Sequence, residues 1–521
     1  MNLALIPAAG KGMRLRELGK HYPKCLLPLN GRPIICETIE ALHPHVDHIF
    51  VAIAEDEDSP LWEMLLGYWK VTILRIPHED TEEGPIGTIR AATRQIVDTV
   101  HLPEDEQNTI TVVLSDAHYK VAFKPLIGQD VLLCMEVGMD TSRWCMVQQE
   151  AIDMCYENKP MRSTSSTALV GVYCFRDLER FVSSLALLDI GGDSEAEISD
   201  LLSAYSNSFS LDWIEKHEFI DFGTIEDYLK NRNVSCCREF NNVEFCGDHV
   251  RKSSKSSSDK LYREACWMKH GPFRHLCPEV YEMHFDAHHD TTGFTMERLT
   301  LPSLRDMMLY HDRSPETWKR VFRELRKFVD VCKFSAVGRE GRGSDFWEGI
   351  LDKNRDRVAL CSEMLSHSHR GLLLRVNAEI LKISEHRRTS LYHGDLHPAN
   401  IFWDDTGRIR FVDPRGDLYG HWLYDVAKLY HSFIGRYDLI DAELYTVKAD
   451  GSVVFYEKGL EPIRELFVTD FLDMIVPEPE TQKFVRNLAA SLFITMVPLH
   501  KHNKTNQQLF LEEAERLTLP I

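Results

Sequence analysis

The chain has 521 residues, enough for two to four domains of ordinary size with sizeable hydrophobic cores. Hydrophobic residues make up 44% and charged residues 27%, a balance typical of globular proteins that excludes wholesale disorder. With 80 acidic against 60 basic residues, the formal net charge is -20, which disfavours coating of a nucleic acid but permits binding of single nucleotides.

The sequence predicts a cytoplasmic protein with reduced thiols. No apolar run reaches the roughly 20 residues of a membrane span, and the N-terminal stretch predicts a buried strand entering a loop rather than a signal peptide. Thirteen cysteines are scattered without a CxxC pair, which favours free thiols over disulfides or a zinc site. We expect small-molecule and nucleotide partners, no nucleic acid and no membrane span, and the sequence leaves a homo-oligomer open.

The first 230 residues alternate short apolar runs with segments of helical spacing. The runs predicted to be strands are Leu3–Ile6, His48–Ile53, Val71–Ile76, Thr109–Leu114 and Val131–Glu136. The predicted helices are Pro33–Leu42, Leu61–Tyr68 and Gly87–Val100. This alternation predicts an α/β, Rossmann-like domain over residues 1–232, with a mixed, mostly parallel sheet that binds ligands at the carboxyl ends of its strands.

A second domain is predicted over residues 237–521, after a helix at Ile225–Asn231. Asn233–Ser254 has the pattern of hairpin strands, and the polar segment Arg251–Ser258 is either a solvated hairpin loop or a linker. From about residue 300 the chain is mainly helical, with predicted helices at Ser303–Tyr310, Pro315–Phe334, Ser344–Ser366 and Leu372–His386. Short strands are predicted at Asn400–Phe402 and Ile409–Val412.

Small and basic residues follow the first predicted strand. The loop consists of Ala8, Ala9, Gly10, Lys11 and Gly12. Glycines permit close approach of a ligand, and free N–H groups of such a loop can cradle phosphate oxygens. Arg14 adds positive charge, and Lys24 lies between two stiffening prolines. Taken alone, the loop is equally consistent with a tight turn.

The segments PAAGKGMRL and HYPKCLLPLNGRPII together resemble the signature of the nucleotidyltransferases that make nucleotide sugars and CDP-alcohols. Met13 departs from the Thr or similar small residue usual in that family, a change that concerns loop packing more than charge. The resemblance implies that the loop Ala8–Gly12 binds the nucleotide and that Arg14 and Lys24 are catalytic.

Further segments follow in the order of that family, and the resemblance implies a role in each. In EGPIGTIRAA, Glu83 and Gly87 approach the nucleotide, and in YENKP, Lys159 meets the acceptor phosphate. VVLSDAHY and IDFGTIEDY supply the metal-binding carboxylates Asp116 and Asp221. Two carboxylates suit Mg²⁺, which neutralises phosphate charge, and the reaction needs no protein nucleophile.

The stretch LYHGDLHPANIFWDDTGRIRFVDPRG (Leu391–Gly416) is the most informative of the chain. Asp395 lies in a loop, Asn400 follows five residues later, and Asp413 comes after a short strand. A kinase needs one carboxylate at the substrate hydroxyl, and an amide with a second carboxylate to hold Mg²⁺ against ATP. The segment strongly resembles the aminoglycoside phosphotransferase and choline kinase family, which implies a bilobal, protein-kinase-like α+β domain.

That resemblance also implies nucleotide-binding residues upstream of the loop. Lys252 in HVRKSS is the expected phosphate-binding lysine, with Lys255 as an alternative. Glu264 is either its helix partner or an exposed residue, and Glu297 lies in the strand that leads to the adenine-binding hinge. No GxGxxG loop precedes Lys252, so a short hairpin is expected to cover the phosphates.

Two features of the catalytic segment remain to be interpreted. His393 and His397 lie four residues apart, but the Gly and Pro around them favour a scaffold of the loop over metal ligation. After Asp413 the chain has Pro414 and Arg415, where that family more often has an aromatic residue and an acidic one, and Arg415 is expected to contact a phosphate, an anionic substrate group or a structural carboxylate.

The two resemblances together predict a bifunctional Mg²⁺-dependent enzyme. The C-terminal domain phosphorylates a small hydroxylated metabolite with ATP, and the N-terminal domain couples that phosphate to a nucleoside monophosphate, from CTP or UTP, with release of pyrophosphate. We favour a sugar or sugar-like polyol, because TALVGVYCF and YENKP resemble sugar-phosphate transferases. The expected product is a nucleotide-sugar-type donor for surface polysaccharide or related glycoconjugate synthesis.

Three alternatives stay open. The first is a choline kinase joined to a phosphocholine cytidylyltransferase that makes CDP-choline. The second is a regulatory or binding protein in which one catalytic domain is degenerate, which the intact aspartates disfavour. The third, an antibiotic-modifying kinase, leaves the first 230 residues unexplained.

Overall fold

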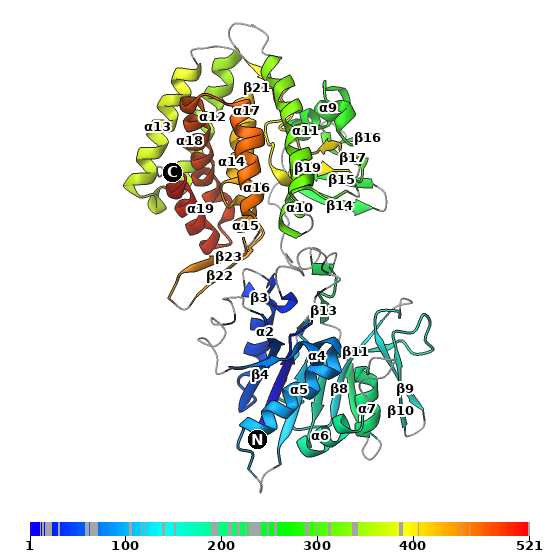
Figure 1. Ribbon diagram of the computed structural model, residues 1–521. Helices are drawn as coiled ribbons and strands as arrows, with labels where there is room; N and C mark the ends of the chain where they lie inside the picture. Colours follow the sequence, from blue (N-terminus) through cyan, green and yellow to red (C-terminus); the bar gives the residue numbers. More distant parts are fainter. Residues whose placement is uncertain are drawn as a thin grey trace. The chain divides into compact units, whose positions relative to one another are not determined.

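The computed structural model describes the chain except residues 11, 13–14, 16–22, 30–31, 58–61, 63–70, 104–106, 116, 120, 138–140, 151–152, 189–195, 207–210, 216–218, 225–226, 229–240, 247–248, 255–257, 287–290, 300, 311–313, 336–341, 385–388, 405, 449, 458 and 519–521. It contains two compact units (Figure 1). The first, the N-terminal unit, comprises Met1–Val234 and Tyr445–Phe455, and the second, the C-terminal unit, comprises Ser235–Leu444 and Tyr456–Ile521.

The N-terminal unit is built on a nine-stranded sheet with the order β10-β9-β11-β6-β1-β4-β5, in which β8 pairs with β11 and β12 pairs with β8. The strands are β1 (Asn2–Pro7), β4 (His48–Ala54), β5 (Val71–Ile76), β6 (Thr109–Val113), β8 (Val131–Glu136), β9 (Cys145–Glu150), β10 (Asp153–Asn158), β11 (Thr167–Phe175) and β12 (Asp212–Glu215). β6, β1, β4 and β5 are parallel, whereas β11 is antiparallel to β6, β8 and β9. The predicted α/β fold with a mixed sheet is confirmed.

Helices cover the sheet because its strands are apolar on both faces. They are α2 (Ile34–Leu42), α4 (His78–Glu82), α5 (Gly84–Thr99), α6 (Leu178–Ala186) and α7 (Ile198–Ser206). Leu3 and Leu5 of β1 point to one face, where they join a core with Ile86 and Ile89 of α5. The intervening Ala4 is equally buried, so side chains on the other face are covered as well. The predicted helix Leu61–Tyr68 lies outside the described residues apart from Trp62, as does Ile225–Asn231 apart from residues 227–228.

The N-terminal unit also contains two small strand pairs, which bear on the site. β2 (Pro28–Leu29) pairs with β3 (Arg32–Pro33), just after the short 3₁₀ helix Lys24–Leu26. β7 (Ala117–Tyr119) pairs with β13 (Phe219–Asp221).

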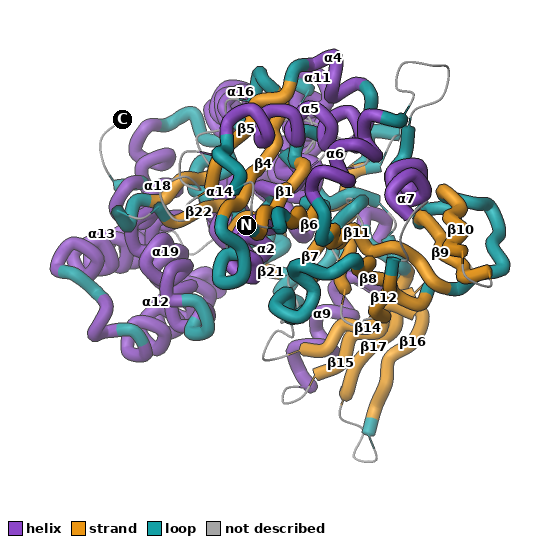
Figure 2. Tube along the Cα trace, turned by 90° about the horizontal axis from the view of Figure 1, so that it is seen from below, coloured by secondary structure: helices purple, strands orange, loops and turns teal. Residues whose placement is uncertain are grey.

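The C-terminal unit begins with an antiparallel sheet in the order β14-β15-β17-β16. Figure 2 shows its strands side by side: β14 (Asn241–Cys246), β15 (His249–Ser254), β17 (Thr291–Glu297) and β16 (Val280–Phe285). Helix α9 (Ser258–His270) packs against this sheet. The interpretation of Arg251–Ser258 as a loop or linker is wrong for Arg251–Ser254, which belong to β15 because Val250 and Lys252 alternate inward with exposed Arg251.

The rest of the C-terminal unit is mainly helical. Its helices are α10 (Leu304–Tyr310), α11 (Pro315–Phe334), α12 (Arg342–Leu360), α13 (His367–Ser384), α14 (Trp422–Phe433), α15 (Tyr437–Asp441), α16 (Glu461–Leu466), α17 (Asp473–Ile475), α18 (Pro479–Met496) and α19 (Lys504–Arg516). The short strand pairs are β18 (Ser390–Leu391) with β21 (Tyr419–Gly420), β19 (Ile401–Trp403) with β20 (Ile409–Phe411), and β22 (Tyr445–Val447) with β23 (Val453–Phe455), the last of which belongs to the N-terminal unit. The predicted α+β architecture is confirmed.

The bounds of two predicted helices need correction. The predicted helix Ser344–Ser366 ends at Leu360, and α13 begins at His367, five residues before the predicted start at Leu372. Ser366 explains the new start, because its Oγ accepts the backbone N–H of His369 at 3.2 Å and so caps the first turn of α13.

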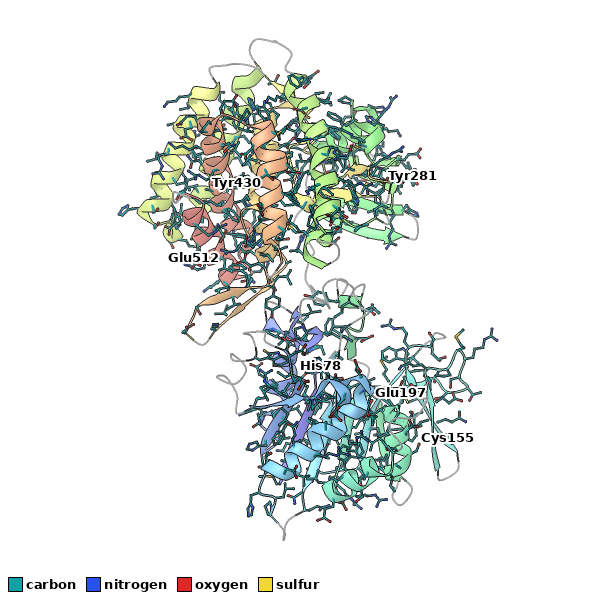
Figure 3. The ribbon with its side chains drawn as sticks, viewed as in Figure 1. His78, Cys155, Glu197, Tyr281, Tyr430 and Glu512 are labelled. Carbon is teal, nitrogen blue, oxygen red and sulfur yellow. The ribbon has the colours of Figure 1, made fainter. Side chains whose placement is uncertain are left out.

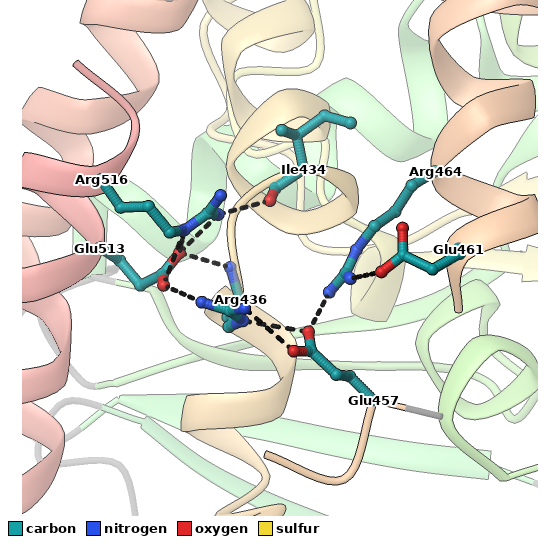
Figure 4. Close-up of polar contacts among 7 residues, drawn as sticks. All are labelled: Ile434, Arg436, Glu457, Glu461, Arg464, Glu513 and Arg516. Carbon is teal, nitrogen blue, oxygen red and sulfur yellow. Dashed lines mark hydrogen bonds and ion pairs between the residues drawn. The ribbon is translucent and has the colours of Figure 1, made fainter. Parts of the chain in front are cut away.

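An ion-pair network joins the C-terminal helix to the middle of the unit (Figure 4). Glu513 of α19, 3% exposed, accepts from Arg436 Nη1 at 2.8 Å and from Arg516 Nη2 at 2.7 Å. Arg436 also contacts both carboxylate oxygens of Glu457, which in turn pairs with Arg464. The network therefore fixes the chain on both sides of Tyr445–Phe455, the segment that belongs to the N-terminal unit. None of the helices in the described part of the chain is both long and apolar enough to cross a membrane.

Candidate functional site

The glycine loop of the N-terminal unit follows the carboxyl end of β1. The N–H of Ala8 donates to the carbonyl of Ala52 at 2.7 Å, which binds the start of the loop to β4, and Ala9 is buried. Gly10 is exposed, and a Cβ there would meet no atom within 4 Å, so the loop has room for a ligand. Gly12 adopts a φ of 58°, a conformation that favours glycine. Lys11, Met13 and Arg14 lie outside the described residues.

Three other residues of the predicted site lie in or next to helices. Lys24 begins the 3₁₀ helix Lys24–Leu26, whose following residues are buried. Glu83 pairs with Arg90 at 2.6 Å, within the predicted segment EGPIGTIRAA. Gly87 has a packing role, because a Cβ there would lie 2.2 Å from the carbonyl oxygen of Asp80 where α4 meets α5.

Asp221 lies at the end of β13, in a cluster of polar side chains. Its Oδ1 accepts the N–H of Gly223 at 2.8 Å, and its Oδ2 lies 2.5 Å from Arg143 Nη2. Arg143 also contacts Asp227 at 2.6 Å. Gly223 must be small, since a Cβ would lie 2.9 Å from the Asp221 carboxylate.

Asp116, the other predicted metal ligand, lies outside the described residues. Its sequence neighbour Ala117 is the register partner of Asp221 across the β7–β13 pair. The next residue, His118, contacts Glu37 of α2 at 2.5 Å, and this contact ties β7 to the helix. A site with two carboxylates, one from each segment, requires β7 and β13 to be neighbours, as they are.

Lys159 follows β10 and is held in an uncommon backbone conformation. Its φ is 45°, which costs of order 1 kcal/mol or more for a residue with a side chain and is found preferentially at functional sites. Its backbone N–H donates to the carbonyl of Trp144 at 2.9 Å, and Thr141 caps the same loop through the carbonyl of Pro160. Its ammonium contacts Glu197, labelled in Figure 3, at 3.0 Å. The loop of residues 141–144 thus contacts both predicted site residues, Lys159 through Trp144 and Asp221 through the adjacent Arg143.

In the C-terminal unit, a buried lysine bridges two carboxylates. Lys252 Nζ lies 2.6 Å from Glu264 Oε1 and 2.8 Å from Asp413 Oδ1. Glu264, on α9, is buried rather than exposed. Burial alone would lower the pKa of Lys252, but the two carboxylates outweigh it and raise the pKa, so the ammonium stays charged. Burial raises the pKa of Glu264 to about 7, against the attraction of Lys252.

Asp413 is positioned by the loop that contains it. Its φ of 55° turns the chain after β20, and Gly416, with a φ of 97°, packs so closely on α9 that a Cβ would meet Arg263 at 2.8 Å. Arg263 adds an ion pair to Asp417 at 2.7 Å. The loop and α9 therefore hold Asp413 and Glu264 on the same ammonium.

The loop that carries Asp395 is held by backbone hydrogen bonds. Asp425 of α14 accepts the N–H of His393 at 2.6 Å and that of Gly394 at 2.8 Å. His393 Nδ1 accepts the N–H of Asp395, and its Nε2 donates to the carbonyl of Val412. Burial lowers the pKa of His393 to about 4, so the ring is neutral and can make both bonds. Its contacts are those of a scaffold for the loop.

Asn400 joins the two catalytic segments. Its Nδ2 donates to the carbonyl of Asp395 at 3.0 Å, and its own carbonyl accepts the N–H of Val412 at 3.0 Å. Asn400 thus fixes the residue before Asp413 relative to the Asp395 loop. Because Nδ2 is engaged, the side-chain oxygen is the group left for a cation.

The side chain of Asp395 faces a lysine of α14. Lys428 Nζ lies 2.9 Å from Asp395 Oδ1, and His397 Nε2 lies 3.9 Å from Oδ2. Burial would raise the pKa of Asp395, but Lys428 and then His397 outweigh it and hold the pKa well below its usual range. Asp395 is therefore ionised and able to accept a hydrogen bond from a hydroxyl.

Glu297 closes the strand that leads out of the small sheet. Its carboxylate contacts Arg410 Nη2 at 2.8 Å and accepts the N–H of Glu279 at 3.1 Å. The side chain therefore joins β17 to β20. Lys255, the alternative to Lys252, lies outside the described residues.

The donor set suits a magnesium ion that is shared with nucleotide phosphates. Within the described ranges, no group of three or more His, Cys, Asp or Glu side chains is placed to hold a metal. Asn400 and Asp413 offer oxygen ligands, and Mg²⁺ typically takes one or two protein carboxylates together with substrate phosphates. Both carboxylate oxygens of Asp221 already accept hydrogen bonds, one from the N–H of Gly223 and the other from Arg143.

Two family models match different parts of the chain. Residues 4–116 match the family model of the MobA-like NTP transferase domain, and residues 249–466 match that of the phosphotransferase enzyme family. The chain joins an NTP transferase domain to a phosphotransferase domain.

The curated relatives match only a short part of the chain. A 2-C-methyl-D-erythritol 4-phosphate cytidylyltransferase of Xylella fastidiosa is 48% identical over 56 residues, which are 10% of this chain and 23% of that protein. A bifunctional protein GlmU of Methanocaldococcus jannaschii is 42% identical over 50 residues, 10% of this chain and 12% of that protein. The chain thus spans less than a quarter of the length of these relatives.

Two solved structures are similar to the same domain. The CTP:phosphocholine cytidylyltransferase of Streptococcus pneumoniae is 18% identical with a TM-score of 0.36, over 45% of this chain and 99% of that one. A UTP-bound UGPase from Acinetobacter baumannii is 16% identical with a TM-score of 0.33, over 44% of this chain and 92% of that one.

Sequence reasoning missed four residues that the structure brings to these sites. They are Arg143 and Asp227 beside Asp221, and Asp425 and Lys428 beside Asp395. In LYDVAKL, Asp425 and Lys428 lie three residues apart on a helix and share a face, a signal that could have singled them out. Nothing comparable marks Arg143.

Proposed function

We propose that the chain is a bifunctional transferase that catalyses two consecutive steps. In the phosphotransferase domain, the hydroxyl of a sugar or sugar-like polyol attacks the γ-phosphorus of ATP, and ADP leaves. In the NTP transferase domain, an oxygen of the new phosphomonoester attacks the α-phosphorus of CTP or UTP, and pyrophosphate leaves. The product is a nucleotide-activated donor of the kind used in polysaccharide or glycoconjugate synthesis.

The bridge from Lys252 to both Glu264 and Asp413 carries this proposal. An ammonium that is held by a helix carboxylate and by the carboxylate after β20 is the arrangement that a kinase uses to position phosphates. Because a buried ion pair is seldom worth more to stability than well-packed apolar residues of the same volume, the stability of the fold alone does not account for these three charges.

Each residue of the phosphotransferase domain then has a task. Lys252 binds ATP phosphates, oriented by Glu264, and Asn400 with Asp413 would hold Mg²⁺, which lowers the charge repulsion at the phosphates when bound. Ionised Asp395 accepts the proton of the substrate hydroxyl as the oxygen attacks phosphorus. Neutral His393 and buried Asp425 keep the Asp395 loop in place through backbone bonds.

In the NTP transferase domain the proposed tasks concern charge and position. The loop Ala8–Gly12 with Arg14 and Lys24 binds and screens the triphosphate, while Asp116 and Asp221 would hold Mg²⁺. Lys159 meets the acceptor phosphate. No residue is needed as a nucleophile, because the phosphomonoester itself attacks.

The test uses the full chain and two readouts. A mixture of sugars, polyols and choline is incubated with ATP and Mg²⁺, and ADP release and new phosphomonoesters are followed by mass spectrometry. The phosphorylated product is then supplied with each NTP, and pyrophosphate release is measured. We expect both activities, on the same metabolite. ADP release without any NTP-dependent pyrophosphate release would instead support a degenerate first domain, and choline as the sole acceptor would support CDP-choline synthesis.

A further inference from the structure

Basic side chains from three segments gather around Asp395 and Tyr424 in the phosphotransferase domain. They are Lys353 and Arg357 on α12, Arg415 in the loop after β20, and Lys428 on α14. Lys428 contacts Asp395 at 2.9 Å, and Lys353 Nζ lies 3.5 Å from the hydroxyl of Tyr424. The arginines are fixed by backbone contacts, since Arg357 Nη1 donates to the carbonyl of Thr495 and the N–H of Arg415 donates to that of His393.

These basic groups are close enough to repel one another. Tyr424 opposes the change, but burial and the positive charges of Arg357, Lys428 and Arg415 lower the pKa of Lys353. Burial and Arg415 also lower the pKa of Arg357, against Tyr424 and Asp395. Basic groups that repel one another inside a fold are unfavourable until a group of opposite charge joins them.

The carboxylates nearby are few and already engaged. Asp417 lies 4.0 Å from Arg415 Nε but is shared with an arginine of α9, and Asp425 accepts two backbone N–H groups. In the described part of the chain, the Nη1 of Arg415 and the hydroxyl of Tyr392 are buried with no hydrogen-bond partner. Tyr392 is 1% exposed, and a buried polar group without a partner is costly. These groups are thus available to a ligand at the side of Asp395.

An aromatic side chain packs next to these polar groups. Phe346 of α12 packs edge-on against the rings of Tyr392 and Tyr424, with ring centroids 5.3 and 5.9 Å apart. Half-buried cations and an unpartnered hydroxyl beside aromatic side chains are features of a site that binds one charged group of a small molecule.

We propose that the hydroxylated substrate of the phosphotransferase domain is an anion, whose carboxylate or phosphate is bound by Arg415, Lys353 and Arg357. The proposal rests on the kinase function proposed above and narrows its substrate to acidic polyols, such as sugar acids. The guanidinium of Arg415 can bind such a group through two parallel hydrogen bonds. A quaternary ammonium such as choline would instead meet several positive charges, so the cluster argues against a choline kinase.

The first test compares matched acceptors of different charge with the full chain, ATP and Mg²⁺. Glucose, gluconate and glucosamine form one set, and glycerol, glycerate, glycerol 3-phosphate and choline form another, with ADP release as the readout. We expect kcat/KM to be at least about 10-fold higher for an anion than for its neutral and cationic analogues. The two anions of the second set separate a carboxylate from a phosphate site. Equal or faster phosphorylation of neutral or cationic compounds would overturn the proposal and leave the kinase function intact. If ATP binds but no hydroxyl compound is phosphorylated, the kinase function fails and the proposal fails with it.

The second test removes single charges. With the best anionic acceptor, Lys353→Met and Arg357→Gln should each raise its KM by about 10- to 100-fold and leave the KM for ATP unchanged. Arg355→Gln is the matched control, because Arg355 lies on the same helix, is 75% exposed and pairs with Asp352 at the surface. An unchanged KM for the anion in both variants, with the fold intact by circular dichroism, would refute an anion site at this cluster.

Discussion

Replacement of Asp395 by Asn separates the chemical role of this residue from its structural one. The backbone of residue 395 makes the scaffold bonds, since its N–H donates to His393 and its carbonyl accepts from Asn400, and both bonds survive the substitution. The side chain loses only its charge and the 2.9 Å ion pair to Lys428. Because Asp395 is 40% exposed but Lys428 only 14%, this loss leaves a largely buried ammonium without its carboxylate and should cost the fold about 1–3 kcal/mol. A positioned general base contributes about 10²–10⁴-fold in rate, so phosphorylation should fall by that factor.

The assay follows ADP release, ATP binding and pyrophosphate release on the same preparation. ATP binding should persist, because Lys252, Glu264 and Asp413 are unchanged. The NTP transferase domain should still convert a phosphomonoester that is supplied directly. Asp404→Asn is the control, since Asp404 lies in the turn between β19 and β20 and Asn can accept the same bonds from the turn. A kinase rate within a few-fold of wild type, or loss of the transferase step with supplied phosphomonoester, would refute the role of Asp395 or the independence of the two sites.

The other predictions concern the second site, the ion-pair network and pH. Asp221→Asn should nearly abolish pyrophosphate release but not ADP release. The control Asp212→Asn, at an exposed position of β12, should change neither. Pyrophosphate release that persists in Asp221→Asn would disprove the metal site. Glu513→Gln removes the buried carboxylate that Arg436 and Arg516 share in Figure 4, so urea denaturation should show a loss of about 3 kcal/mol, and the exposed neighbour Glu512→Gln should show none. His393 has its pKa lowered to about 4 by burial, so the unfolded chain binds more protons below pH 6.5, and the fold should lose roughly 2 kcal/mol between pH 7 and 5. The variant His393→Gln should lack this loss, and parallel stability curves for the two proteins would contradict the reasoning.

The parts predicted from sequence are those whose contacts are local. Asp395, Asn400 and Asp413 lie within 19 residues, and the short hairpin β19–β20 brings the carbonyl of Asn400 to the N–H of Val412. A pattern of residue types at fixed spacing therefore carries most of the geometry. The parallel strands were equally visible, because burial on both faces gives an uninterrupted apolar run such as that of β1.

The parts that were missed depend on packing between distant segments. Arg143 reaches Asp221 across 78 residues, and Lys428 meets Asp395 only because α14 packs beside the catalytic loop. No spacing rule encodes such contacts. Polar composition was misleading at Arg251–Ser254, because this strand, next to the edge of its sheet, has Ser and basic residues and an exposed Arg251. The predicted helix Ser344–Ser366 ran past its true end at Leu360 because the 3₁₀ turn Ser362–Met364 that follows contains no Gly or Pro.

The cation cluster offers a last prediction, because function and stability should oppose each other there. Lys353 is held among positive charges, and its lowered pKa means that the folded state binds its proton less tightly than the unfolded chain does. Lys353→Met should therefore stabilise the fold in urea denaturation at pH 7, while it weakens binding of the acidic substrate. The surface control Arg355→Gln should change neither quantity by more than about 0.5 kcal/mol. A lysine kept for structure would behave in the opposite way, since its removal would destabilise the protein and leave substrate affinity unchanged. If Lys353→Met destabilised the protein, this result would exclude a site in which the cations repel one another and are kept to bind an anion.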